Sequence, residues 1–150
     1  MAGSVCGRAA GLAVLLAFLA AGAGHARSRP NTLLLGDLGG GAKLWLMTDS
    51  VRQDEAGVRH GWTVIDYETL QTTQNVQYRS DASKFYVKCK TQEIDLANAI
   101  KFAGQMGGGA NVFQVNSEPT PEPAAQDYHP VRPNTAEQVV AKAICKQRIR

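Results

Sequence analysis

Residues 83–90, SKFYVKCK, decide the fold because apolar and polar side chains alternate along them. A strand turns successive side chains to opposite faces of a sheet, so this alternation predicts a strand with one buried face. The residues expected to point inward are Phe85, Val87 and Cys89; those expected to point outward are Lys84, Tyr86, Lys88 and Lys90. The inward cysteine is then within reach of a helix packed on that face.

Segments on both sides of this stretch are short apolar runs or are rich in aromatic and β-branched residues, as strands are. They are residues 43–48, 60–70, 74–79, 93–102 and 111–115. Residues 93–102 also fit a helix, but the glycines at 104 and 107–109 favour a hairpin turn and therefore a strand. Five or six strands joined by short turns predict an antiparallel sheet.

The chain changes character after the last of these strands. Residues 117–133 contain five of the six prolines and are expected to form an extended connector. Asn134 or Thr135 can then cap a helix, with Glu137 or Gln138 in the reciprocal position. One apolar stripe with helical spacing follows, made of Ala136, Val139, Val140, Ala143 and Ile144. We therefore expect an α+β fold, an antiparallel β-sheet of five to six strands followed by one C-terminal helix.

The N-terminal segment has the features of a secretory signal peptide. Residues 9–24 carry no charge and follow Arg8, and small residues come next, so we place the cleavage site after Ala26. The uncharged run is shorter than the roughly 20 residues that cross a bilayer as a helix. We expect residues 1–26 to be a signal peptide, 27–42 a flexible lead-in and 43–150 a single domain. The protein is then exported to the periplasm or the outer cell surface, with no transmembrane segment after cleavage.

Two of the three cysteines, Cys89 and Cys145, remain after cleavage. An even number of cysteines in an oxidising compartment indicates a disulfide. The competing interpretations are a metal-binding pair and a nucleophilic thiol, but metal and redox pairs use much closer spacings than this one. We expect a disulfide that ties the C-terminal helix to the sheet.

Composition and motifs argue against several classes of protein. The net charge is +3, and it falls to +2 when Arg8 leaves with the signal peptide, which is too little for a nucleic-acid-binding surface. Residues 36–41 are glycine-rich but lack the Lys and Ser or Thr of a phosphate-binding loop. His60 and His129 have no partner at metal-ligand spacing. No nucleophile elbow is present, so we expect no enzyme, cofactor or metal site.

The outward residues of the first stretch form the best candidate binding face. Three ammonium groups and one ring, from Lys84, Tyr86, Lys88 and Lys90, can hold an anionic glycan or an acidic stretch of a partner protein. The alternative is a solvated face, since exposed lysines keep sheets soluble and prevent pairing at their edges. An exposed sheet face would also permit a homodimer.

Several motifs occur together in a recognisable order. They are a short strand with Trp45, VIDY at 64–67, KFYVKC at 84–89, the proline-rich segment, and PNTAE at 133–137 leading to Cys145. Over about residues 43–146 the chain therefore resembles the bacterial surface-adhesin protein E family. The resemblance implies a disulfide-tethered, somewhat PAS-like domain, exported by a Gram-negative bacterium, that adheres to host proteins.

Two other functions are compatible with the same sequence. One is a periplasmic protein that contacts envelope components and has no adhesive role. The other is a PAS-like sensor of small ligands, which would need an apolar pocket between the helix and the sheet.

Overall fold

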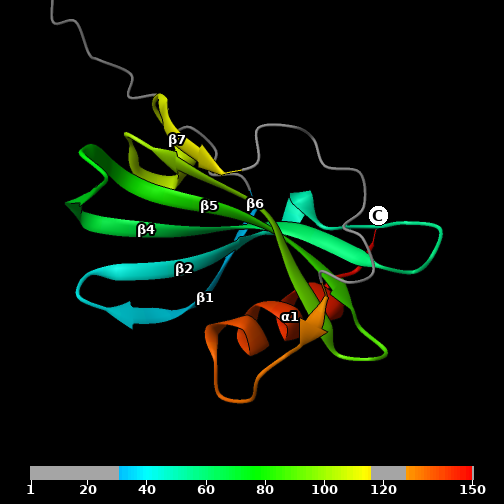
Figure 1. The fold of residues 1–150 in the computed structure, drawn as a ribbon. Coiled ribbons are helices and arrows are strands. Elements are labelled where there is room, and N and C mark those ends of the chain that lie inside the picture. The colour runs from blue at the N-terminus through cyan, green and yellow to red at the C-terminus, as the bar shows by residue number, and fades with distance from the viewer. Residues whose placement is uncertain (1–30, 116–127, 150) are drawn as a thin grey trace, which may run out of the picture.

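Figure 1 shows the computed structural model of the chain, which describes residues 31–115 and 128–149. The strands are β1 (Thr32–Gly39), β2 (Ala42–Met47), β3 (Arg52–Gln53), β4 (Arg59–Thr73), β5 (Val76–Lys88), β6 (Glu93–Phe102), β7 (Asn111–Val115) and β8 (His129–Pro130). The helices are the short 3-10 turns η1 (Thr48–Ser50) and η2 (Gln105–Gly107) and the α-helix α1 (Ala136–Lys146). The expected signal peptide and most of the proline-rich connector lie outside the described residues.

The strands form one antiparallel sheet in the order β1-β2-β4-β5-β6-β7. Of the two short strands, β3 pairs with β4 and β8 pairs with β6. Neighbours along this path follow one another in the chain, with η1 and β3 inserted between β2 and β4, and α1 comes last. The expected fold is confirmed: an antiparallel sheet with six strands on its main path, followed by a C-terminal helix.

The edge strand β1 lies where we expected a flexible lead-in. Its leucines pair with β2, for example Leu33 with Leu46, and the two strands form a hairpin. Residues 39–41 close this hairpin, and all three are glycines with positive φ. The glycines that indicated flexibility instead provide the left-handed backbone that a tight turn needs.

Two expected strands, residues 74–79 and 83–90, are parts of the single strand β5. The polar residues between them do not interrupt it because each has a partner across the sheet. The Ser80 hydroxyl donates to a carbonyl of the β6–β7 turn at 2.6 Å, and Asp81 forms an ion pair with Lys101 on β6. Partners so distant in sequence leave no local signal.

The core lies between α1 and one half of the sheet (Figure 1). Its buried members are Leu44, Leu46, Val51, Val87, Ile94, Val140, Ala141 and Ile144. The outer ends of β1, β2, β4 and β5 extend beyond the helix (Figure 1). In the described parts of the chain, no helix has the length and apolarity needed to cross a membrane.

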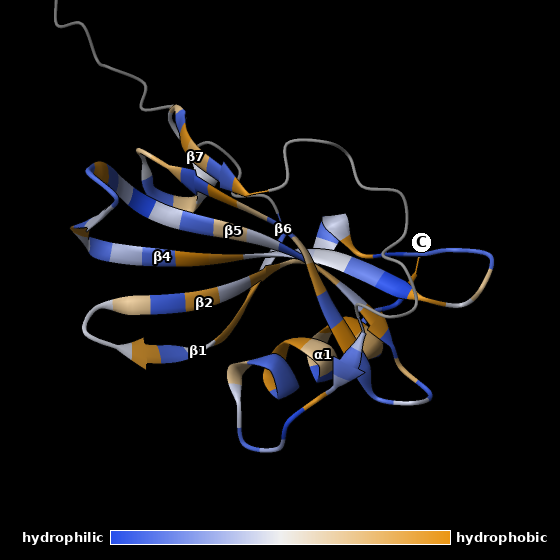
Figure 2. Cartoon of the chain, viewed as in Figure 1, coloured by the Kyte–Doolittle hydropathy of each residue, from blue (hydrophilic) through white to orange (hydrophobic). Residues whose placement is uncertain are grey.

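Helix α1 begins as expected but buries a slightly different stripe. Thr135 caps it, with its Oγ1 accepting from the Gln138 amide at 3.3 Å. Val139, expected in the core, is 41% exposed, and Ala141 is buried in its place. Ala141 lies one turn before Cys145, so the disulfide side of the helix faces the sheet. Figure 2 shows the resulting bands of apolar and polar residues along α1.

Candidate functional site

The expected binding row on β5 lies on the face of the sheet opposite α1. Side chains alternate along a strand, and the residues between the row's members pack toward the core under α1. Lys84, Tyr86 and Lys88 therefore share the far face. Their neighbours on β4 are Trp62, opposite Lys84, and His60, opposite Tyr86.

Tyr86 does not present an exposed ring. Its side chain is buried, with 5% of the residue surface exposed. The His60 ring lies 5.1 Å away, centroid to centroid, and the Lys84 Nζ atom lies 5.0 Å from the Tyr86 centroid. The expectation of an exposed ring is therefore wrong, because neighbours on β4 and β5 lie against it, and a binding role for Tyr86 stays a prediction.

The other two lysines of the row differ in their surroundings. Lys88 Nζ lies 3.8 Å from the centroid of the Tyr128 ring and 3.9 Å from a carboxylate oxygen of Glu93. Lys90 lies beyond the end of β5, exposed in the turn to β6. The structure thus brings Lys84 and Lys88 to one face and leaves Lys90 outside it, and a binding role for these lysines stays a prediction.

The histidine beside this row adds no positive charge at neutral pH. Burial lowers the pKa of His60 below its ordinary value, and the positive charges of Lys84 and Arg52 lower it further, with Asp54 acting in the opposite direction. Its Nδ1 atom is buried without a hydrogen-bond partner among the described residues. His60 is therefore neutral near pH 7.

A second cluster, farther along the sheet, combines two tyrosines with an ion pair. Lys101 pairs with Asp81, and its Nζ atom lies 4.4 Å from the centroid of Tyr78. Tyr67 meets Tyr78 edge to face, with the centroids 5.7 Å apart. Burial, with smaller contributions from Tyr78 and Asp81, raises the pKa of Tyr67 to about 12. These groups are partners of one another, so the cluster stabilises the sheet.

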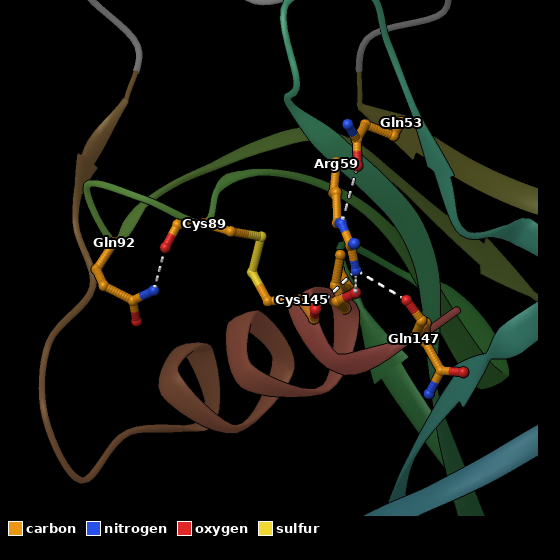
Figure 3. Close-up of a disulfide and its surroundings, with 7 residues drawn as sticks. Gln53, Arg59, Cys89, Gln92, Cys145 and Gln147 are labelled. Atoms are coloured by element: carbon orange, nitrogen blue, oxygen red, sulfur yellow. Dashed lines mark hydrogen bonds between the residues drawn. A yellow bond between two sulfur atoms is a disulfide. The ribbon is translucent and has the colours of Figure 1, made fainter. Parts of the chain in front are cut away.

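Figure 3 shows the expected disulfide between Cys89 and Cys145, which is confirmed. It joins the end of β5 to the last turn of α1, with the Cα atoms 5.8 Å apart. Beside it, Arg59 Nη1 donates to the carbonyl oxygens of Ile144, Cys145 and Gln147 at 3.2, 2.6 and 2.8 Å. A guanidinium group at this end satisfies carbonyls that lack partners within the helix and complements its dipole.

Two clefts lie at the C-terminal end of α1. The smaller, of about 520 Å³, is lined by the disulfide together with Arg59, Lys88 and Lys90, among others. The larger, of about 890 Å³, lies between η1 and residues 146–149. Between α1 and the sheet, by contrast, Leu46 and Ile144 have no exposed surface, and the side chains form one core cluster. Among the described residues, the space between α1 and the sheet is thus filled by packed side chains.

Sequence reasoning missed Arg59 and the residues of the larger cleft. Arg59 bonds carbonyls more than 80 positions away, so its neighbours in the chain carry no sign of that role. The cleft joins residues near position 50 to residues near position 147, and only the fold brings them together. Within the described residues, no group of three His, Cys, Asp or Glu side chains could hold a metal ion.

Comparison with known proteins identifies the family. Residues 34–146 match the family described as Surface-adhesin protein E. The chain belongs to this family. The match includes most of β1, so the adhesin E domain begins earlier than the expected residue 43.

One solved structure agrees with this assignment at the level of the fold, and a second is reported beside it. Crystal form II of Haemophilus influenzae protein E has a TM-score of 0.51 and 14% identity, over 75% of this chain and 95% of that one. Protein E from non-typeable Haemophilus influenzae has a TM-score of 0.49 and 14% identity, over 78% and 85%. None of the curated proteins compared with the chain matches it.

Membership of a surface-adhesin family and the presence of a disulfide both indicate an exported protein. Disulfides persist in oxidising compartments, and adhesins act outside the cytoplasm. The disulfide and the family of this domain are thus both those of an exported protein.

Proposed function

We propose that this adhesin E domain is an exported, non-enzymatic binding module that acts at the outer cell surface and contacts a host macromolecule. The observation that carries the proposal is the family match over residues 34–146, which spans nearly the whole described domain. The fold supports it in a second way. One face of the sheet is used by α1, and the opposite face and the ends of the sheet remain to meet a partner.

The row on β5 is one candidate contact within this proposal. Lys84 and Lys88 provide positive charge on the face opposite α1, and Lys90 adds a charge at the strand end. A partner for this surface would be an anionic glycan or an acidic segment of a protein. Replacing all three lysines by Gln removes the charge and leaves the core unchanged, so the variant should fold and lose any binding that depends on the row.

A binding assay with purified protein tests the proposed function. The chain from residue 27 onward is applied to immobilised host matrix proteins and, in parallel, to outer-membrane and peptidoglycan fractions. Saturable binding to a matrix protein, absent after reduction and heat unfolding, supports the host-binding module. Saturable binding to envelope fractions alone would overturn it and favour the periplasmic, envelope-associated function.

A further inference from the structure

The larger cleft, of about 890 Å³, lies where η1 meets the C-terminal tail of the chain. Figure 1 shows the end of the described chain close to the loops that contain η1 and β3. Its volume is within the range of about 300–1,000 Å³ that ligand sites occupy. Of the groups that line it, Val51 forms a buried floor and is 3% exposed.

Positive charge dominates the lining of this cleft. Among the described lining residues, Arg52 from β3 and Lys146 and Arg148 from the C-terminal end contribute three cations, against the one carboxylate of Asp49. Within the described residues, none of the three cations lies within 4.0 Å of a carboxylate oxygen. The cleft therefore holds cationic groups that no described side chain neutralises.

The wall that carries Arg52 is held in place before any ligand arrives. Arg52 Nη1 donates to the carbonyl oxygens of Asp49 and Val51 at 2.7 and 2.8 Å. The Thr48 hydroxyl donates to the Asn31 carbonyl at 2.6 Å. Among the described residues, the other guanidinium nitrogens of Arg52 have no hydrogen-bond partner, so an anion would meet a guanidinium group whose orientation is already fixed.

The carbonyl end of a helix normally repels anions, and here Arg59 removes that obstacle. Its guanidinium group donates to the carbonyls of Ile144 and Cys145 in the last turn of α1 and to that of the C-cap residue Gln147. The partial negative charge of the helix end is thereby reduced. The positive charges of Lys146 and Arg148 can then act on a ligand in the cleft.

We propose that this cleft binds a segment of a sulfated, acidic polysaccharide, with sulfate and carboxylate groups held by Arg52, Lys146 and Arg148. Guanidinium groups bind such oxyanions through paired hydrogen bonds. The rest of the lining is mostly amide and hydroxyl groups, such as those of Asn31, Thr48 and Gln147, and these suit sugar hydroxyls. An acidic peptide is less favoured, because protein partners bind through aromatic and Arg anchors in desolvated pockets and no aromatic side chain lines this cleft.

This inference rests on the proposed function, since it names a ligand class and a site for the binding module. It also makes the cleft, rather than the row on β5, the principal anion-binding surface. Variants that each remove three positive charges can distinguish binding in the cleft from binding to the row on β5. The cleft variant is Arg52→Gln, Lys146→Gln, Arg148→Gln, and the row variant is Lys84→Gln, Lys88→Gln, Lys90→Gln; a loss in the row variant alone would overturn the inference. The matched control, with the same change of charge at exposed positions outside both surfaces, is Lys43→Gln, Arg132→Gln, Lys142→Gln.

The experiment measures the affinity of a defined heparin oligosaccharide for the purified chain from residue 27 onward, by calorimetry at fixed salt. The cleft variant should lose affinity by roughly tenfold or more, since charge-assisted contacts are removed, and the control should stay close to the parent. The double variant Lys146→Gln, Arg148→Gln keeps the structural bonds of Arg52 and should lose affinity as well. Asp49→Asn should bind more tightly, because the carboxylate of Asp49 in the described lining loses its charge.

Equal losses in the cleft and control variants, or a loss in the control alone, would overturn the inference. Binding of poly-glutamate as tight as that of heparin would replace the polysaccharide by an acidic protein. The desulfated oligosaccharide should bind much more weakly, and equal binding would contradict the role of sulfate. These results use purified protein and do not depend on cell location, so a cleft that binds heparin in a periplasmic protein would contradict the proposed function alone.

Discussion

At the scale of single residues, Gly61 on β4 sets how closely the sheet approaches α1. A Cβ atom at this position would lie 3.1 Å from the Val51 Cγ2 atom and 3.6 Å from the Ile144 Cδ1 atom. Both neighbours are in the core. A Cβ atom at Gly61 would therefore press on Val51, the floor of the larger cleft, and would already touch Ile144, which leaves no space for further methyl groups in that direction.

Gly61→Val should destabilise the fold by about 1–3 kcal/mol, the usual cost of overpacking a core. Thermal unfolding of the purified protein measures it. Gly36→Val on β1 is the matched control, because nothing lies within 4 Å of a Cβ atom there. If both variants melt at the same temperature, the close approach at Gly61 does not exist.

His60 should make stability depend on pH. Its pKa is lowered in the folded chain, whereas the unfolded chain has the ordinary value of 6.5, so the unfolded state binds the proton more readily. The contribution of the neutral His60 side chain to the free energy of unfolding is fully present above the unfolded-state pKa. It is lost as the pH falls through the folded-state pKa. His60→Gln should therefore make the melting temperature depend less on pH between about pH 8 and about pH 5. An unchanged slope would show that this imidazole titrates alike in both states.

At the scale of the elements, the disulfide determines how α1 is held. Helices of this length are marginal alone in water, and their stability comes from packing. The bridge from Cys89 anchors the last turn at Cys145, and the cap at Thr135 fixes the first. Between these two ends, the buried side chains of α1 pack against core residues of β2, β5 and β6.

The double variant Cys89→Ser, Cys145→Ser should be less stable by about 4 kcal/mol, the value expected for a closed loop of this length. It leaves no unpaired thiol, and chemical reduction of the parent should produce the same melting temperature. A double variant that melts with the parent would show that the bridge contributes nothing to holding the helix.

The elements that local pattern describes could be predicted from the sequence. Period-two alternation at residues 83–90 gave part of β5, and the cap and period of 3.6 gave α1 and brought its cysteine to the sheet. What depends on distant partners could not be predicted. β1 is a strand because it pairs with β2, and the ring of Tyr86 is buried because His60 packs against it. Neither partner is visible in the local sequence.

The candidate site follows the same division. The row on β5 could be located from alternation, but its ion pair and ring contacts depend on Glu93 and on Tyr128, which lies within the proline-rich connector. The larger cleft could not be predicted, since it joins η1 to residues that follow α1. A local sequence pattern can predict which side chains share a face of one strand. A cleft between segments that are far apart in the sequence can be found only from the folded structure.

At the scale of the whole molecule, the two ends of the sheet differ in structure. One end carries α1, the disulfide and the two clefts, and the other extends as hairpins beyond the helix (Figure 1). The edge strand β1 exposes Leu33 and Leu34, at 43% and 49%. Exposed edges invite pairing, so the homodimer stays a prediction that light scattering of the purified protein can check.

Protease treatment of intact and permeabilised cells, followed by blotting for the chain, tests most directly whether this adhesin E domain acts at the outer surface. A periplasmic marker that survives in intact cells confirms that the outer membrane is closed. A surface binding module should be digested in intact cells. Protection until the cells are permeabilised would contradict the surface role and place the protein in the periplasm.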